Sequence, residues 1–172
     1  MPSRPRPVTV RLLKPGESIP RELYRAYLTV VPKTSLRAVE QMAEPVERGD
    51  PRAIGVGVFN GETMVGFSLG RHDQTAAPID FAGRPDLASS NYTTRVHTYI
   101  APGYTGHALD VLNLFKRQAR QRGSDLLIIS DMNQKSEAFI TALRRREGKR
   151  DRNSIHIIES PLLKTKNAYI RL

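Results

Sequence analysis

The feature that most constrains the fold of this chain is a change of apolar periodicity within residues 94–130. A β-branched and aromatic stretch ends at Ile100 and is followed by a Pro- and Gly-containing segment, residues 101–106. From Ala108 apolar residues recur at helical spacing, and residues 126–129 then form a short, wholly apolar run. This change of period predicts a strand, a loop, a helix and a buried strand in that order.

The predicted loop has a chemical property that depends on the backbone alone. A helix that begins directly after a strand leaves its first N–H groups unpaired and directs the positive end of its dipole toward the loop. Such a loop can hold a phosphate group. An ordinary strand–helix corner that binds nothing fits the same pattern, and both interpretations remain open on this evidence.

The N-terminal part of the chain reads as a strand, two helices and a hairpin. Residues 8–13 alternate as a strand, one helix lies between Ser18 and Pro32, and a second begins after Ser35. We expect a loop over residues 44–52 and a hairpin over residues 53–71. Its Asn60-Gly61 pair predicts a type I′ turn, because both residues accept positive φ.

The remaining segments complete the predicted element order. Residues 72–92 show no sustained period, and a loop of this length is either functional, here as a cover over substrate, or mobile. Asn133 is expected to cap a helix that ends in an arginine cluster. Two closing strands are predicted over residues 154–158 and 168–172.

Composition limits the class of protein. A chain of 172 residues fits one domain, predicted over residues 8–172 after a flexible basic tail, residues 1–7. The absence of cysteine excludes disulfides, cysteine-based zinc sites and a cysteine nucleophile. No apolar run approaches the ~20 residues of a membrane span, so we expect a cytoplasmic protein without membrane contact. The formal net charge of +10 favours an anionic partner.

Residues 100–109 resemble the acetyl-CoA loop of the GNAT (general N-acetyltransferase) superfamily. Pro102, Tyr104 and Gly106 fall on its pattern. The predicted order β-α-α-β-β-β-α-β-α-β-β is also similar to that of the GNAT fold. The resemblance implies an α/β (α+β) fold with a mixed, mostly antiparallel central sheet flanked by helices.

The same loop departs from the GNAT pattern at three positions. Thr105 stands where the family has Arg or Gln, Ala108 where it has Gly, and Asp110 where it has Gly or Ala. A carboxylate at position 110 would repel a nearby pyrophosphate. Ile140 occupies the position at which family members often have a general-acid tyrosine. These departures favour the alternative that acyl transfer is lost or altered in this chain.

The resemblance implies a cofactor site. Acetyl-CoA would be the co-substrate, the Ile100 N–H would donate to the thioester carbonyl, and the amides of residues 105–108 would hold the pyrophosphate. Asn133 matches a family asparagine beside the pantetheine arm, and a role as a simple helix cap is compatible with this. The residues expected to bind the cofactor are Ile100, Gly103, Thr105, Gly106, His107, Ala108 and Asn133.

Transfer of an acyl group to an amine needs a base with a pKa near the working pH. His97 is the catalytic candidate because it lies on the cofactor strand and only histidine titrates near neutrality unperturbed. Its other interpretation is a packed or hydrogen-bonded strand residue. Tyr99 should project to the same face, and Tyr104 is a further candidate proton donor. The four histidines lack metal-ligand spacing, so no metal is expected.

The expected acceptor is an amine on a small molecule or a protein, and both a monomer and a homodimer are open. Residues 113–152 hold eleven Lys and Arg against five acidic residues. This surplus is either a solvated surface or a site for an acidic protein or nucleic acid. The alternative function is therefore a GNAT-like protein that binds or modifies nucleic acid through Arg117, Arg120, Arg144, Arg145, Arg146, Lys149 and Arg150.

Overall fold

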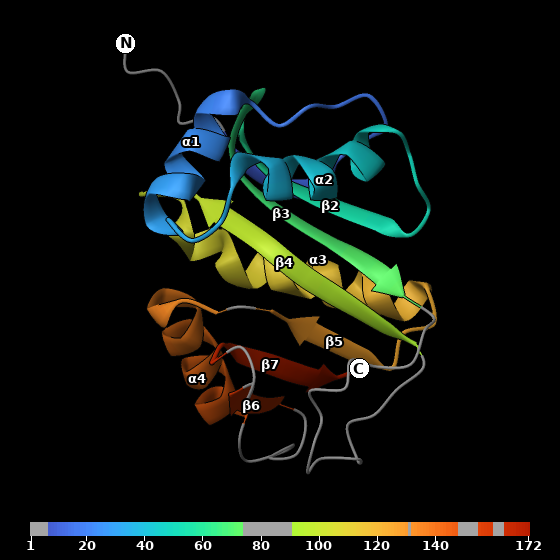
Figure 1. The fold of residues 1–172 in the computed structure, drawn as a ribbon, viewed down its shortest axis with the longest axis vertical. Coiled ribbons are helices and arrows are strands. Elements are labelled where there is room, and N and C mark those ends of the chain that lie inside the picture. The colour runs from blue at the N-terminus through green and yellow to red at the C-terminus, as the bar shows by residue number, and fades with distance from the viewer. Residues whose placement is uncertain (1–6, 74–90, 131, 148–154, 160–163) are drawn as a thin grey trace. The chain divides into compact units, whose positions relative to one another are not determined.

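The computed structural model describes residues 7–73, 91–130, 132–147, 155–159 and 164–172 (Figure 1). Its strands are β1 (Val8–Leu12), β2 (Ala53–Asn60), β3 (Thr63–Asp73), β4 (Tyr92–Ile100), β5 (Leu126–Ile129), β6 (Ile155–Glu159) and β7 (Lys166–Arg171). Its helices are α1 (Arg21–Val30), α2 (Leu36–Glu47), α3 (Ala108–Gln121) and α4 (Gln134–Glu147), with a 3₁₀ turn, η3 (Thr105–His107), before α3. The predicted order of elements is confirmed.

The strands form a seven-stranded sheet in the order β1-β2-β3-β4-β5-β7-β6. The β1–β2, β2–β3, β5–β7 and β6–β7 pairs are antiparallel, whereas β4 and β5 are parallel. The parallel pairing joins Tyr92–Arg95 of β4 to Leu126–Ile129 of β5 in register. The mixed, mostly antiparallel sheet expected from the sequence is therefore present, with the helix α3 as the crossover between its parallel strands.

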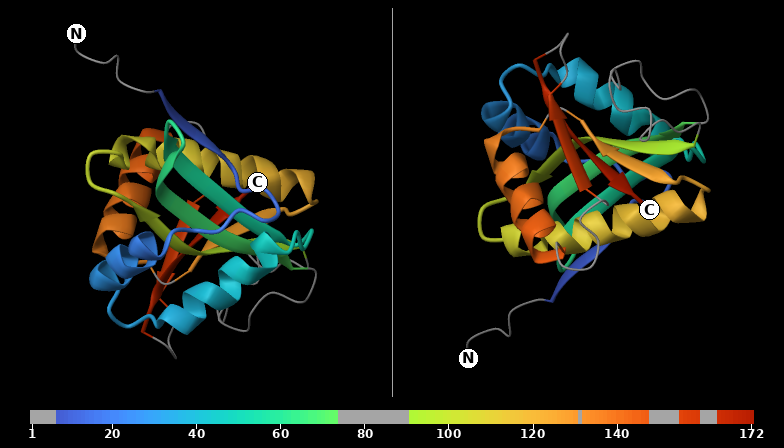
Figure 2. Two further views of the ribbon diagram at one scale, coloured as in Figure 1. Left: turned by 90° about the horizontal axis from the view of Figure 1, so that it is seen from above. Right: turned by 90° about the horizontal axis from the view of Figure 1, so that it is seen from below.

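The chain divides into two compact units. The first comprises residues 1–71 and 97–115, and the second comprises residues 72–96 and 116–172. Within the first unit, α1 and α2 lie on the same side of the β2–β3 hairpin (Figure 2). The second unit contains β5, β6, β7 and α4.

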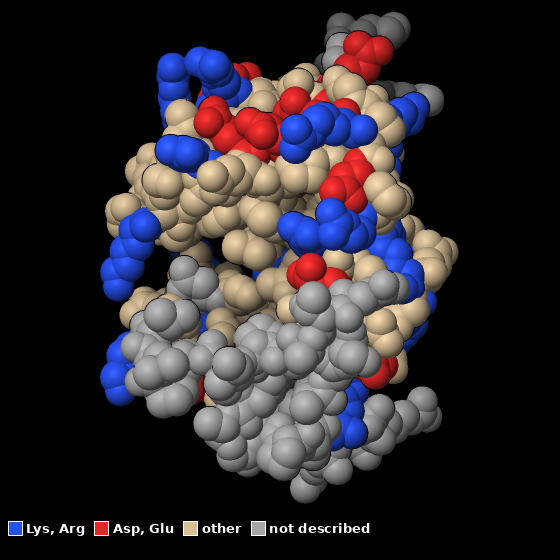
Figure 3. Space-filling model, turned by 45° about the vertical axis from the view of Figure 1, so that its right-hand side comes forward, with Lys and Arg blue, Asp and Glu red and all other residues tan. Residues whose placement is uncertain are grey.

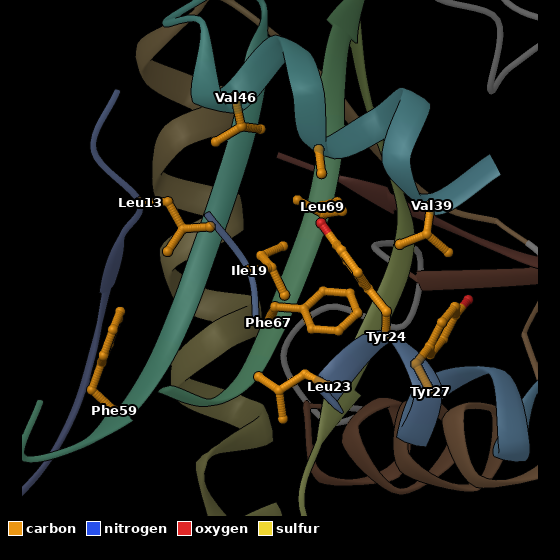
Figure 4. Packing of buried hydrophobic residues seen from close by; sticks show 11 residues of the cluster. Leu13, Ile19, Leu23, Tyr24, Tyr27, Val39, Val46, Phe59, Phe67 and Leu69 are labelled. Carbon is orange, nitrogen blue, oxygen red and sulfur yellow. The ribbon is translucent and has the colours of Figure 1, made fainter. Parts of the chain in front are cut away.

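The core of the first unit is built around Phe67 of β3, which is fully buried. Tyr24 and Tyr27 of α1 both meet the Phe67 ring edge-on, with ring centroids 5.7 Å away (Figure 4). Edge-to-face pairs of this kind contribute about 0.5–1.5 kcal/mol each beyond the burial of their area. Helical spacing places Leu23, Tyr24 and Tyr27 on the buried face of α1, and the two tyrosine rings therefore point into this core.

The helix α2 continues past the point at which the sequence predicts a loop. The helix begins after Ser35 as expected, and Ser35 caps it by accepting a hydrogen bond from the Ala38 N–H, but the helix runs through Pro45 to Glu47. The predicted loop from residue 44 is therefore wrong over its first residues. Val46 is buried and lies where a Cβ on Gly55 of β2 would come within 2.6 Å of it. Packing of Val46 against β2 outweighs the helix-breaking tendency of Pro45.

The β2–β3 turn differs by one residue from the predicted turn. Asn60 pairs with Thr63, so Gly61 and Glu62 form the two-residue turn instead of Asn60-Gly61. Gly61 has a φ of 63° and is followed by a residue without positive φ. Positive φ at the first central residue alone is typical of a type II′ turn. The hairpin is confirmed, but the predicted type I′ turn is wrong.

The predicted loop over residues 72–92 is shorter at both ends, since β3 reaches Asp73 and β4 begins at Tyr92. The interpretation of its middle, residues 74–90, lies outside the described residues, as does nearly all of the predicted N-terminal tail. Within the second unit, Tyr92, Leu126, Ile128 and Tyr169 form a buried cluster. Among the described residues, no helix is long and apolar enough to cross a membrane.

Candidate active site

The loop after β4 is a tight turn that its sequence explains. The Tyr104 N–H donates to the Ala101 carbonyl at 3.0 Å, and Gly103 between them has a φ of 90°. Proline at the second position and a glycine with positive φ at the third are typical of a type II turn. The Ala101 N–H donates to the Val65 carbonyl of β3 at 2.9 Å, which attaches the turn to the hairpin.

The helix that follows begins with the 3₁₀ turn and leaves two N–H groups open. The His107 N–H donates to the Tyr104 carbonyl at 3.0 Å, and the Ala108 N–H donates to the Thr105 carbonyl. Within the described part of the chain, the N–H groups of Thr105 and Gly106 donate to no backbone carbonyl. Of the four amides expected to face a pyrophosphate, these two are therefore available.

Gly106 is not required by the geometry of the chain itself. Its φ is not positive, and a Cβ added to it would meet no described atom within 4 Å. The space next to Gly106 on its Cβ side is thus open, and glycine leaves the backbone approachable by a ligand. Nearby, His107 Nδ1 lies 3.1 Å from Asp110 Oδ2, and Asp110 is exposed. The carboxylate that departs from the GNAT pattern therefore has a hydrogen-bond partner of its own.

His97 is buried on β4, with 6% of its surface exposed, and its Nδ1 lies 2.8 Å from the Tyr27 hydroxyl. The two rings also meet edge-on, with centroids 5.5 Å apart. Such a partner fixes the orientation of the imidazole, and whether the hydroxyl donates or accepts depends on the tautomer of the ring. Sequence reasoning did not find Tyr27, because nothing near His97 in the sequence indicates a partner on the first helix.

Tyr99 and Tyr104 lie in different surroundings. Tyr99 packs against the same hydrophobic cluster as Tyr27, and its ring is 6.4 Å from Phe67, so it shares the side of β4 that His97 occupies. Tyr104 is held instead by Asn60 at the end of β2, whose Nδ2 donates to the phenol oxygen at 2.8 Å. The phenol keeps its own O–H as a donor.

The C-terminal half of β4 has a backbone edge without a strand partner in the described ladder. Pairing with β5 ends at Arg95, whose carbonyl accepts a hydrogen bond from the Ser130 N–H at 3.0 Å, while β4 continues to Ile100. The Ala101 N–H points toward β3, and successive N–H groups of a strand point to opposite edges. The Ile100 N–H is therefore directed away from β3.

Asn133 lies in the second unit and caps α4 as predicted. Its Oδ1 accepts a hydrogen bond from the Ser136 N–H at 2.9 Å, and its side chain is exposed. Ile140, at the position of the family tyrosine, is fully buried. A packing role therefore accounts for Ile140, and a role of Asn133 beside a pantetheine arm stays a prediction.

The basic residues of α3 and α4 are largely solvent-exposed. Arg117, Arg120 and Arg144 to Arg146 are exposed, whereas Lys149 and Arg150 lie outside the described residues. On the face in Figure 3, acidic side chains lie among the basic ones. The nucleic-acid alternative stays a prediction. In the described ranges, no group of three or more His, Cys, Asp or Glu is placed to hold a metal ion.

Comparison with known proteins identifies the fold. No family model and no curated protein match the chain. Among solved structures, FeeM, an N-acyl amino acid synthase from uncultured soil microbes, is 16% identical with a TM-score of 0.59, over 96% of this chain and 91% of its own. A GNAT family acetyltransferase from Elizabethkingia anophelis with acetyl-CoA bound is 13% identical with a TM-score of 0.54, over 96% and 98%.

A third similar structure is the PaiA N-acetyltransferase from Thermoplasma acidophilum in complex with coenzyme A. It is 12% identical with a TM-score of 0.53, over 96% of this chain and 99% of its own. The chain therefore has the fold of GNAT acetyltransferases, as the resemblance of residues 100–109 implied.

Proposed function

We propose that this protein is an N-acyltransferase that moves an acyl group, most simply acetyl, from acyl-CoA to an amine acceptor. The observation that carries the proposal is the start of the helix after β4, where the N–H groups of Thr105 and Gly106 donate to no described backbone carbonyl and a Cβ on Gly106 would meet no described atom within 4 Å. Two N–H donors at a helix N-terminus suit a phosphate group. Two of the similar structures, from Elizabethkingia anophelis and Thermoplasma acidophilum, hold acetyl-CoA and coenzyme A.

Acyl-CoA supplies a thioester, whose carbonyl carbon is attacked by the acceptor amine. A C–N bond forms, the C–S bond breaks, and the thiolate leaves. The Ile100 N–H, directed away from β3, would donate to the thioester oxygen as negative charge develops on it. Gly103 shapes the turn, and the amides of Thr105 and Gly106 bind phosphate oxygens, with His107 and Ala108 continuing the helix start. Asn133 would contact the pantetheine arm.

Two proton transfers accompany this chemistry. The acceptor ammonium must lose a proton before attack, and His97 is the proposed base, oriented by its hydrogen bond to Tyr27. The nitrogen loses its second proton as the amide forms, and this proton reaches the departing thiolate by way of Tyr104 or Tyr99, the proposed donors. Tyr104 is favoured by its geometry, because Asn60 donates to its oxygen and leaves the phenol proton available.

Calorimetric titration of acetyl-CoA and CoA into the wild type and the Gly106→Ala variant tests this function. Because the added methyl meets no described atom, the variant should fold with an unchanged Tm but bind CoA at least about tenfold more weakly, roughly 1.4 kcal/mol. Asn113→Ala on the exposed side of α3 is the matched control. Absence of CoA binding by the wild type at millimolar concentration would contradict the proposal, as would equal binding by Gly106→Ala.

A further inference from the structure

Arg95 is a buried arginine on β4, and its backbone is hydrogen-bonded in the sheet. It is the last residue of β4 paired with β5, and its carbonyl accepts a hydrogen bond from the Ser130 N–H at 3.0 Å. Only 6% of its surface is exposed. Arginine is rarely buried to this extent unless an anion pairs with it.

No such anion is found in the described part of the chain. Among the described residues, no carboxylate forms an ion pair with Arg95 and no oxygen accepts a hydrogen bond from its guanidinium. Burial lowers its pKa to about 10, which still leaves the group protonated at neutral pH. Some other cations are paired with a carboxylate, for example Arg11 with Glu17 at 2.7 Å. A guanidinium that is only 6% exposed and has no partner among the described residues loses most of its contact with water at a cost, and an incoming anion would reduce that cost.

The donor geometry and the single charge of a guanidinium favour a carboxylate over a phosphate as its anion. Its parallel N–H donors match the two oxygens of a carboxylate, and one positive charge balances one carboxylate. A phosphate carries closer to two negative charges and would be only partly balanced. Because so little of Arg95 is exposed, only a small ligand can reach it. We propose that Arg95 binds the carboxylate of a small-molecule ligand.

The proposal is tested first by binding, with acetate as the probe. The Arg95 Nε–Hε signal of ¹⁵N-labelled protein is identified by its loss in Arg95→Met. Millimolar sodium acetate should shift this signal and raise the Tm of the wild type more than sodium chloride at the same ionic strength. Arg95→Met should show no acetate response, and Arg95→Lys should respond only weakly.

The stability of Arg95→Met gives a second, independent readout. The variant replaces a guanidinium that has no partner among the described residues by an apolar side chain of similar length, so the Tm of the ligand-free variant should equal or exceed that of the wild type. A clear fall in Tm would show that the chain itself pairs Arg95, and would overturn the proposal. An identical response of the wild type to acetate and chloride would also overturn it.

Two sources of the carboxylate are distinguished by activity. If it belongs to the acyl acceptor, which rests on the proposed function, glycine and β-alanine should be acetylated with at least tenfold higher kcat/KM than glycinamide, and Arg95→Met should abolish this preference. Equal rates for acids and amide would assign the site to a separate carboxylate ligand. Absence of any transfer would contradict the proposed function, while the acetate titration still decides the role of Arg95.

Discussion

The hydroxyl of Tyr27 lies 2.8 Å from Nδ1 of His97, joining residues that are 70 positions apart in the sequence. Both side chains are buried. The contact therefore fixes the orientation of the proposed base through α1, which lies far before β4 in the sequence. It also makes the base sensitive to changes in α1.

Replacing Tyr27 by phenylalanine keeps the ring and removes only the hydroxyl. A buried nitrogen of His97 then loses this partner, which should lower the free energy of unfolding by about 1–3 kcal/mol. Urea denaturation measures this loss. Tyr24→Phe is the matched control, since Tyr24 packs against the same Phe67 ring at the same distance, and it should change stability by less than about 0.5 kcal/mol. Equal losses in both variants would contradict the role assigned to the contact.

Alanine at Gly103 should destabilise the turn after β4, although nothing blocks its methyl group. The φ of 90° is unfavourable for any L-residue with a Cβ and should cost about 1–2 kcal/mol. Gly106→Ala, three residues on, has equally open space without positive φ and should be neutral within about 0.5 kcal/mol. Thermal denaturation of the two variants compares them directly. A neutral Gly103→Ala would show that the turn is not held in this conformation.

Alanine at Gly55 should clash with α2, because the new Cβ would lie 2.6 Å from Val46 Cγ1. Overpacking of this kind typically costs about 1–3 kcal/mol. The double variant Gly55→Ala/Val46→Ala removes the opposing methyl groups and should be more stable than the sum of the two single losses predicts. Chemical denaturation of the wild type, the two single variants and the double variant measures their free energies of unfolding. Strict additivity of the two single losses would show that the two side chains do not compete for space.

Stability should depend on pH through His72. Burial, reinforced by Arg122, lowers the His72 pKa below its ordinary value of 6.5 in the folded protein. The unfolded chain therefore binds the proton first, and the contribution of His72 to stability is complete above about pH 6.5 and falls as the pH drops toward the folded pKa. Urea titrations between pH 5 and 8 should show a shallower loss in His72→Gln than in the wild type. A parallel loss in both proteins would assign the effect to other groups.

The structural reason for this behaviour is a polar cluster of the second unit. His72 Nδ1 and Thr93 Oγ1 each lie 2.8 Å from Ser124 Oγ, and all three residues are buried. The other ring nitrogen of His72 has no hydrogen-bond partner among the described residues. Protonation would place a charge on a ring whose second nitrogen is unsolvated, which explains the direction of the pKa shift.

Sequence reasoning succeeded where the controlling interactions are local. Asn133 was predicted as a helix cap and accepts a hydrogen bond from the residue three positions along the chain, and the helix predicted to begin after Ser35 begins at Leu36. It failed where packing outweighed a local preference. Pro45 disfavours a helix, but α2 continues through it to Glu47 and Val46 is buried. It also misplaced the hairpin turn by one residue, because the pairing of Asn60 with Thr63 decides which residues are central.

The sequence by itself determined the order of strands and helices and the turn that follows β4. Apolar periodicity and the φ preferences of Pro102 and Gly103 act over a few residues, so they can be read along the chain. Only the tertiary structure decided that His97 meets Tyr27, that Asn60 holds Tyr104 and that Arg95 is buried without a partner among the described residues. These relationships depend on which surfaces pack together, and side chains far apart in sequence meet only after the sheet and its helices have assembled.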